Sequence, residues 1–181
     1  MEKQELELLR YPIGRFVLPG KPSLEDVEKS ISIIKAFPEL LKGEVEGLDD
    51  AQLDTPYRPE GWTLRQVVHH VADSHMNAYI RFKWTLTEDT PEIKTYREGE
   101  WAKLPDVNGT PIEMSMSLLE ALHRKWVYLL KALNPGQWQL VLYHPGFGKE
   151  IILSQLVCQY SWHCMHHLGH IRSLKESNNW P

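Results

Sequence analysis

The sequence predicts an all-α fold, a four-helix bundle with a small β-hairpin before the last helix. Two observations predict it: four stretches in which apolar residues recur at three- and four-residue steps, and proline- and glycine-rich connections between them. The chain has 181 residues, 42% of them apolar, which is enough to bury one core. We therefore expect a single domain over residues 1–181, with an irregular N-terminal arm at residues 1–22, where prolines and glycines are frequent.

The first predicted helix begins after Ser23, a favourable N-cap residue, and runs to about Lys42. Pro38 lies inside it and lacks the backbone N–H that a helix uses. We therefore expect a kink or a break after Phe37.

A polar loop at residues 49–62 leads to the second predicted helix, residues 64–87, which Thr63 caps. The next segment, residues 88–111, has no periodicity and holds three prolines and two glycines. Connections of that length are uncommon unless they are functional. We expect this segment to form a lid over a site or a dimer contact.

The second half of the chain supplies the rest of the fold. Apolar spacing predicts a third helix at residues 112–133 and a fourth at about residues 154–176. Between them, two β-prone runs at residues 139–143 and 150–153 flank a turn with Pro and Gly, which predicts the hairpin.

Composition excludes several classes of protein. The net charge is −4 and no basic run occurs, which argues against nucleic-acid binding. No apolar stretch approaches about 18 residues, so no membrane span is predicted. The acidic N-terminus is unlike a secretory signal, and we expect a cytoplasmic protein. Cys158 and Cys164 lie too far apart on one helix to form a disulfide.

Histidine is the unusual residue of this sequence, because four of the nine histidines lie within residues 163–170. At about 100° per residue, His163 and His167 share the apolar face of the fourth helix with Tyr160 and Ile171. These two imidazoles are therefore one turn apart and directed at the bundle core. One such histidine is usually a core residue bonded to a carbonyl, but helix carbonyls are already occupied.

A stacked pair favours metal binding over a structural role. A buried polar ring without a partner costs about 1–3 kcal/mol, and a divalent cation takes a lone pair from both rings at once. The spacing i, i+4 is that of zinc-binding helices. His166 and His170 repeat the spacing but are rotated about 60° towards the edge of the face, where they would flank the ligands or line the mouth of the site.

A bundle site needs a ligand from another helix, and the second helix offers His69, His70 and His75. His75 lies near the centre of its apolar stripe, His70 lies about 100° away and His69 faces away from the core. Periodicity alone favours His75, whereas a site at the rim of the bundle would use His70.

Three segments resemble the DinB/YfiT-like family, and most closely its YfiT branch of metal-dependent hydrolases. They are Leu53–Arg58, Gly61–Arg81, which contains His-His-Val-Ala-Asp, and Trp162–Ile171, which contains Trp-His-Cys-Met-His-His. The resemblance covers nearly the whole chain, from Tyr11 to the C-terminus.

This resemblance implies a four-helix bundle that holds one divalent ion, zinc or nickel, through three histidines. The matching positions are His70, His163 and His167. The resemblance thus selects His70 where periodicity selected His75, which becomes a neighbour of the site. It also implies a cytoplasmic homodimer.

Three neutral imidazoles would leave the ion one open position, the arrangement of catalytic rather than structural zinc. Hydrolysis of a small-molecule substrate by activated water is the direct interpretation. The alternative is a thiol S-transferase that conjugates a low-molecular-weight thiol such as bacillithiol, since relatives of this branch resemble such enzymes. A non-catalytic stress or binding module that the metal stabilises, and a helical interaction protein with structural histidines, are the remaining hypotheses.

Other residues of the site are less defined by sequence. Tyr57, Trp62 and Trp162 are candidates for pocket walls, although aromatic residues near helix ends more often serve packing. Anionic substrates could be anchored by arginine, the candidates being Arg58, Arg65 and Arg81. As general bases, only Asp73 and Glu60 are near in sequence, and each is more readily explained as a solvated carboxylate.

Overall fold

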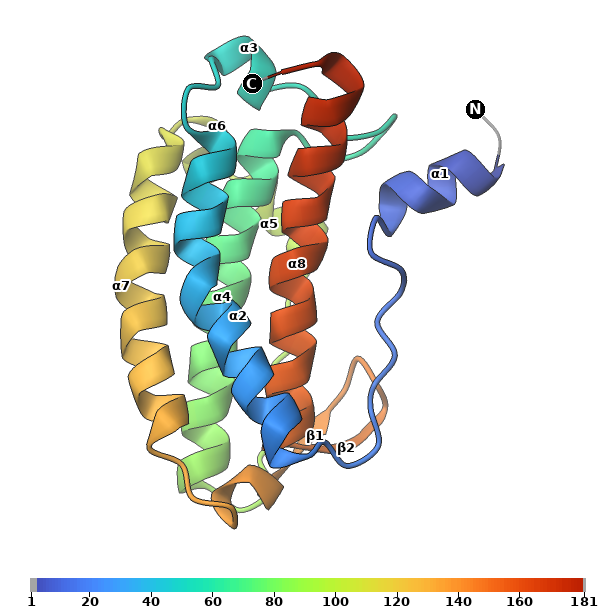
Figure 1. Ribbon diagram of the computed structural model, residues 1–181. Coiled ribbons are helices and arrows are strands. Elements are labelled where there is room, and N and C mark those ends of the chain that lie inside the picture. The colour runs from blue at the N-terminus through green and yellow to red at the C-terminus, as the bar shows by residue number, and fades with distance from the viewer. Residues whose placement is uncertain (1–2, 181) are drawn as a thin grey trace.

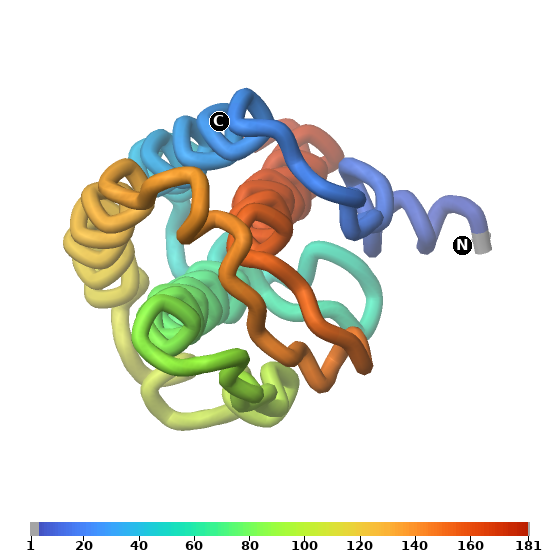
Figure 2. The backbone as a smooth tube through the Cα atoms, turned by 90° about the horizontal axis from the view of Figure 1, so that it is seen from below, coloured from blue at the N-terminus to red at the C-terminus, as the bar shows by residue number. Residues whose placement is uncertain are grey.

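The computed structural model describes residues 3–180 and shows a bundle of four long helices, of which the first and last run in one direction and the two middle ones in the other (Figure 1). These are α2 (Leu24–Val45), α4 (Leu64–Thr87), α7 (Ile112–Lys131) and α8 (Leu153–Asn178). Helix α2 packs against α7 and α8, and α4 packs against the same two helices. The end-on view shows the resulting square, with α2 and α4 on one diagonal (Figure 2). The predicted bundle is confirmed.

Short elements connect the long helices. They are α1 (Lys3–Arg10), α3 (Asp50–Leu53), α5 (Glu98–Trp101), α6 (Pro105–Asn108), the 3-10 turn η1 (Gln137–Gln139), β1 (Val141–His144) and β2 (Lys149–Ile152). The two strands form the predicted antiparallel hairpin, with Val141 opposite Ile152 and His144 opposite Lys149.

Side-chain caps begin α2 and α4 where the sequence predicts them. The hydroxyl of Thr63 accepts from the N–H of Gln66 at 3.1 Å, and the Gln66 amide oxygen accepts from the N–H of Thr63 at 3.0 Å. Ser23 and Asp26 form the same reciprocal pair at the start of α2. Each cap satisfies N–H groups that have no partner inside the helix.

Of the kink or break predicted at Pro38, the break does not occur, because α2 continues through Pro38 to Val45. Packing against two neighbouring helices outweighs the cost of the proline. The missing N–H has a local consequence, however. The carbonyl four residues earlier, that of Ile34, has no helical donor.

Three segments predicted to be irregular contain helical turns. Helix α1 lies within the arm predicted at residues 1–22, because Lys3–Arg10 has neither proline nor glycine and the breakers begin only at Pro12. Helix α3 lies in the polar loop at residues 49–62, and α5 and α6 lie in residues 88–111.

The N-terminal arm packs closely against α8 at a glycine, Gly169. A Cβ atom at Gly169 would lie 2.9 Å from Cγ of Pro12 and 3.5 Å from Cγ2 of Ile13. Only a residue without a side chain allows the arm to approach α8 this closely. The end of α1 therefore reaches the histidine-rich part of α8.

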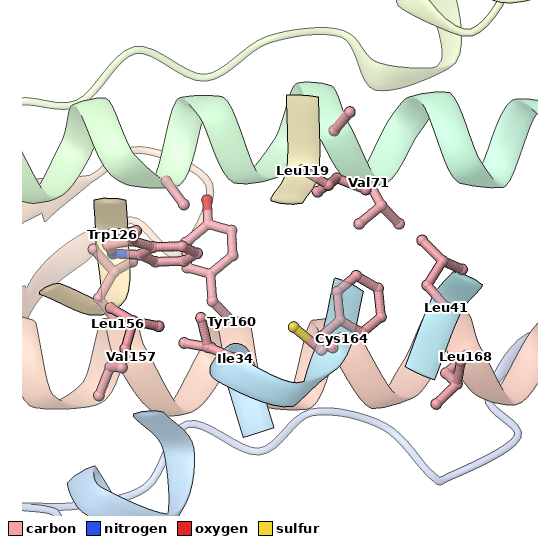
Figure 3. Close-up of a cluster of buried hydrophobic side chains, with 14 of the residues drawn as sticks. Ile34, Leu41, Val71, Leu119, Trp126, Leu156, Val157, Tyr160, Cys164 and Leu168 are labelled. Carbon is pink, nitrogen blue, oxygen red and sulfur yellow. The ribbon is translucent and has the colours of Figure 1, made fainter. Parts of the chain in front are cut away.

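The core fills the space between the four long helices. Figure 3 shows part of it, with Ile34 and Leu41 from α2, Val71 from α4, Leu119 and Trp126 from α7, and Leu156, Tyr160, Cys164 and Leu168 from α8. All of these side chains are at most 3% exposed. Both cysteines are free, as expected. Among the helices of residues 3–180, none has both the length and the hydropathy needed to cross a membrane.

Candidate metal centre

Three histidines from two helices converge at one side of the bundle. His70 lies on α4, while His163 and His167 lie one turn apart on α8. One ring nitrogen of each lies within 4.8 Å of the others, so the group can hold a metal ion. The Nε2 atoms of His163 and His167 are 3.2 Å apart, and the ring centroid of His70 is 4.9 Å from that of His167.

Burial keeps these imidazoles neutral. Desolvation lowers the pKa of His70 to about 4, and it holds the pKa values of His163 and His167 well below the usual range. A neutral imidazole has one nitrogen with a free lone pair, which is the form that binds a metal. The three side chains therefore offer metal ligands at neutral pH without losing protons first.

The spacing of the nitrogens fits a small divalent cation. Two nitrogens that each lie about 2.0–2.1 Å from a tetrahedral zinc ion are about 3.3 Å apart. The two Nε2 atoms of His163 and His167 are separated by nearly this distance, 3.2 Å. Two lone pairs that face each other this closely repel, and a cation between them turns the repulsion into two bonds.

A chain of buried histidines leads from α2 to His163. Nδ1 of His123 lies 2.6 Å from the carbonyl oxygen of Ile34, the carbonyl that Pro38 leaves without a helical donor. Nε2 of His123 lies 2.8 Å from Nδ1 of His75, and Nε2 of His75 lies 3.1 Å from Nδ1 of His163. We call this chain the α7 relay, because His123 lies on α7.

The carbonyl at the end of the α7 relay fixes the proton on every ring. A carbonyl oxygen only accepts, so Nδ1 of His123 carries the proton and its Nε2 accepts. His75 must then donate from Nδ1 and accept at Nε2, which requires His163 to donate from Nδ1. Burial holds the pKa of His75 well below its usual value and lowers that of His123 to about 4, so both rings are neutral. The free lone pair of His163 is therefore on Nε2, the atom that faces His167.

A shorter relay orients His167 by the same logic. The carbonyl of Arg10 at the end of α1 lies 3.2 Å from Nε2 of His170, and Nδ1 of His170 lies 3.4 Å from Nδ1 of His167. The last carbonyls of a helix have no helical donor, so that of Arg10 is free to accept. His170 then accepts from Nδ1 of His167, which leaves the lone pair of His167 on Nε2.

His166, His167 and His170 form a second group whose nitrogens lie within 4.8 Å of one another. It shares His167 with the first group. Nε2 of His167 faces His163, and Nδ1 faces His170. All three rings of this second group are buried, although periodicity had placed His166 and His170 at the edge of the face.

The three histidines line a cavity of about 680 Å³. Other residues on its walls are Arg10, Tyr11, Tyr57, Arg58, Trp62, Ser74, Arg81, Thr95, Tyr96, Glu98, His144, Gln159, Tyr160, Trp162, His166 and His170. The predicted pocket residues Tyr57, Arg58, Trp162, His166 and His170 are all among them. The segment at residues 88–111 contributes Thr95, Tyr96 and Glu98, so it forms part of the wall.

Aromatic rings support the histidines from the cavity side. Tyr57 stacks on His170 with ring centroids 4.0 Å apart, and Trp162 stacks on His166 at 4.3 Å. Trp62 lies 4.5 Å from the ring of His70. These contacts limit the rotation of the imidazoles and place apolar ring faces on the cavity wall.

Several sequence predictions for individual residues need correction. His69 does not face away but is buried against α7, where its Nδ1 lies 2.7 Å from the hydroxyl of Ser115. His75 is fully buried as predicted, but it contacts the far side of His163 and does not line the cavity. Asp73 and Glu60 do not line the cavity either, although burial raises the pKa of Asp73 to about 6.

Sequence reasoning missed two histidines. His123 terminates the α7 relay, and His144 lines the cavity from β1. Each is a single histidine in its segment, with no spacing to mark it. Pro38 was the available signal for His123, because a proline inside a helix frees the carbonyl four residues earlier.

Comparison with known proteins assigns the chain to a family. The model of the DinB superfamily matches residues 34–171, which include His70, His163 and His167. The structure is similar to that of YfiT from Bacillus subtilis, described as a probable metal-dependent hydrolase with an unusual four-helix bundle topology. That match has a TM-score of 0.93 and 44% identity, and it covers 96% of this chain and 99% of that one.

Relatives from two further bacteria match nearly the whole chain over nearly their whole length. A protein of Bacillus mycoides strain KBAB4 is 48% identical over 172 residues, 95% of this chain and 98% of the relative. One from Geobacillus thermodenitrificans is 45% identical over 175 residues, 97% of this chain and 98% of the relative. Both carry the name "Putative metal-dependent hydrolase". On this family match and these identities, the chain is a member of the DinB superfamily.

Proposed function

We propose that the protein is a metal-dependent hydrolase of small molecules, with zinc or nickel held by His70, His163 and His167. The observation that carries the proposal is the position of these three histidines. Their nitrogens converge within 4.8 Å on the wall of a cavity of about 680 Å³, a size that suits a small substrate. The names of the relatives support the same class of reaction.

The two relays favour an open coordination position. His75 and His170 are bonded to Nδ1 of His163 and of His167, away from the facing Nε2 atoms. Neither is therefore placed to become a fourth ligand. A three-histidine site with an open position is catalytic rather than structural, which separates the proposal from a module that uses metal only for stability.

The residues of the chain have distinct roles in this proposal. A divalent ion bound by three imidazoles supplies Lewis acidity and lowers the pKa of water. The relays hold two of the imidazoles in the tautomer that binds an ion, so that no rotation or proton transfer is needed on binding. The aromatic walls position a small substrate and exclude bulk water from the reacting bond.

The function is tested by assaying the zinc-loaded and nickel-loaded protein against a panel of activated esters and alkyl electrophiles, with and without a small thiol. We expect product without thiol from at least one ester, and none from His163→Ala, whose ligand set is incomplete. His69→Ala is the matched control, because His69 is buried outside the cavity.

The same assay decides against the proposal if product forms only with thiol and the thiol is consumed. That outcome would assign the site to thiol S-transfer, since an ion with an open position can also hold a thiolate. Absence of any metal-dependent reaction with either class of substrate would contradict both enzymatic functions.

A further inference from the structure

A buried arginine lines the cavity without an acidic partner. Arg81 is 6% exposed, and none of the ion pairs found in residues 3–180 includes it. Its Nη1 donates to the hydroxyl of Tyr160 at 2.8 Å, and its Nη2 donates to the carbonyl of Lys94 at 3.1 Å. Its Nε is buried and has no partner within residues 3–180. Buried charges are normally paired, because an unpaired one costs several kcal/mol.

A second polar side chain near Arg81 also lacks partners. His144 is 7% exposed and lines the same cavity, and in the described part of the chain neither of its ring nitrogens has a hydrogen-bond partner. Desolvation and the nearby Arg81 charge lower its pKa to about 4, so it is neutral and carries one N–H donor. Two buried donors, Nε–H of Arg81 and the N–H of His144, thus have no acceptor among the described residues, and both side chains line the cavity.

The charge of the cavity points the same way. Glu98, which is exposed, is the one acidic residue among its lining residues within the described chain. Arg81 adds a fixed positive charge, and a bound divalent ion would add two more. A low-dielectric cavity with this excess of positive charge favours an anionic ligand.

We propose that Arg81 and His144 form an anion subsite that receives a carboxylate or phosphate group of the substrate. The subsite adjoins the histidine triad, because Tyr160 contacts Arg81 through its hydroxyl and its ring centroid lies 6.0 Å from that of His163. The anion subsite rests on the proposed hydrolase function and names the substrate class of that function. The substrates would be small molecules that carry an anionic group close to the bond that is cleaved.

The test follows the Nε–H resonance of Arg81 in metal-free protein, where no metal competes for the anion. Acetate, inorganic phosphate and chloride are titrated separately at constant ionic strength, with the resonance identified by its loss in Arg81→Lys. We expect a saturable shift with acetate, with phosphate or with both, and none with chloride. Acetate alone would define a carboxylate subsite, and phosphate alone a phosphate subsite. No saturable shift with either anion would overturn the proposal.

Two charge-removing variants on the same helix provide the control. Arg81→Met is expected to weaken binding of the effective anion by about tenfold or more, because it removes charge-assisted hydrogen bonds. Arg65→Met removes the same charge, but Arg65 pairs with Asp50 and Asp54 and does not line the cavity. Circular dichroism checks that both variants are folded. Equal weakening of anion binding in both would show that the effect comes from net charge alone, and would refute the subsite.

A kinetic comparison separates this proposal from the hydrolase function. With zinc-loaded protein, a carboxylate- or phosphate-bearing ester should have about tenfold higher kcat/KM than its neutral analogue, and Arg81→Met should remove the difference. Equal rates on both esters would contradict the subsite while the hydrolase function stands. If neither ester is cleaved, the function fails, and the resonance titration still decides the subsite.

Discussion

His70→Ala is expected to abolish stoichiometric zinc binding, whereas His69→Ala, one residue away, leaves it intact. The two histidines are adjacent on α4 and both are buried. Only His70 belongs to the group that converges with His163 and His167, while His69 is bonded to Ser115. Loss of one of three ligands should weaken zinc affinity by at least about a hundredfold. Elemental analysis of the purified variants, with competition against a chelating dye, measures this directly.

Thermal unfolding gives an independent measure of the same prediction. A ligand at about a hundred times its Kd stabilises the native state by about 2.7 kcal/mol, which is roughly 5–10 °C in Tm for a protein of this size. Zinc should therefore raise the Tm of the native protein and of His69→Ala, but not that of His70→Ala. Retention of one zinc ion per chain by His70→Ala would show that the ion is held elsewhere.

His75→Phe is expected to weaken zinc binding by about 10–100-fold although His75 is not a ligand. In the α7 relay, Nε2 of His75 accepts a hydrogen bond from Nδ1 of His163, which leaves the free lone pair of His163 on its Nε2. Phenylalanine fits the surrounding rings of Phe37, Trp126 and Tyr160 but accepts no hydrogen bond. His163 would then lose the partner that fixes its tautomer, and part of the population would present N–H to the metal.

His75→Gln is the matched variant, because an amide offers both an acceptor for His163 and a donor for His123. It should recover most of the affinity lost in His75→Phe, a difference that a purely structural role would not produce. Long-range proton–nitrogen correlation spectra of the metal-free native protein test the relay without any variant. They should show His75, His123 and His163 all protonated at Nδ1. Protonation of His163 at Nε2, or native zinc affinity in a folded His75→Phe, would disprove the relay.

The fourth helix shows how much of the site could be read from sequence. The spacing of His163 and His167 is purely local, because helical geometry alone puts residues i and i+4 on one face. Their neighbours Tyr160 and Ile171 mark that face as apolar. The pair was therefore predictable from α8 alone, and the structure places both rings on the cavity.

The partner from α4 was not predictable in this way. Periodicity gives the direction in which each side chain points around the helix. It does not show which part of the apolar stripe borders a cavity. His75 lies at the centre of the stripe and is enclosed by other side chains, whereas His70 lies at its edge, where the cavity opens. Only the resemblance of the segment around His70 to a known family selected the residue that the structure groups with His163 and His167.

The relays depend on contacts between distant parts of the chain. His123 and Ile34 are 89 residues apart, and His170 and Arg10 are 160 apart. The expectation that helix carbonyls are already occupied failed at two places, at Ile34 because of Pro38 and at Arg10 because α1 ends there. Sequence can mark such free carbonyls, but it does not show which side chain will reach them.

The most direct test of the metal centre is a crystal structure of the zinc-loaded protein with an anomalous map at the zinc edge. We predict one ion per chain, about 2.0–2.1 Å from a ring nitrogen of His70 and from Nε2 of His163 and His167, with a fourth position facing the cavity and occupied by no side chain. An ion bound by His166 and His170 instead, or one closed off by a fourth protein ligand, would contradict this account.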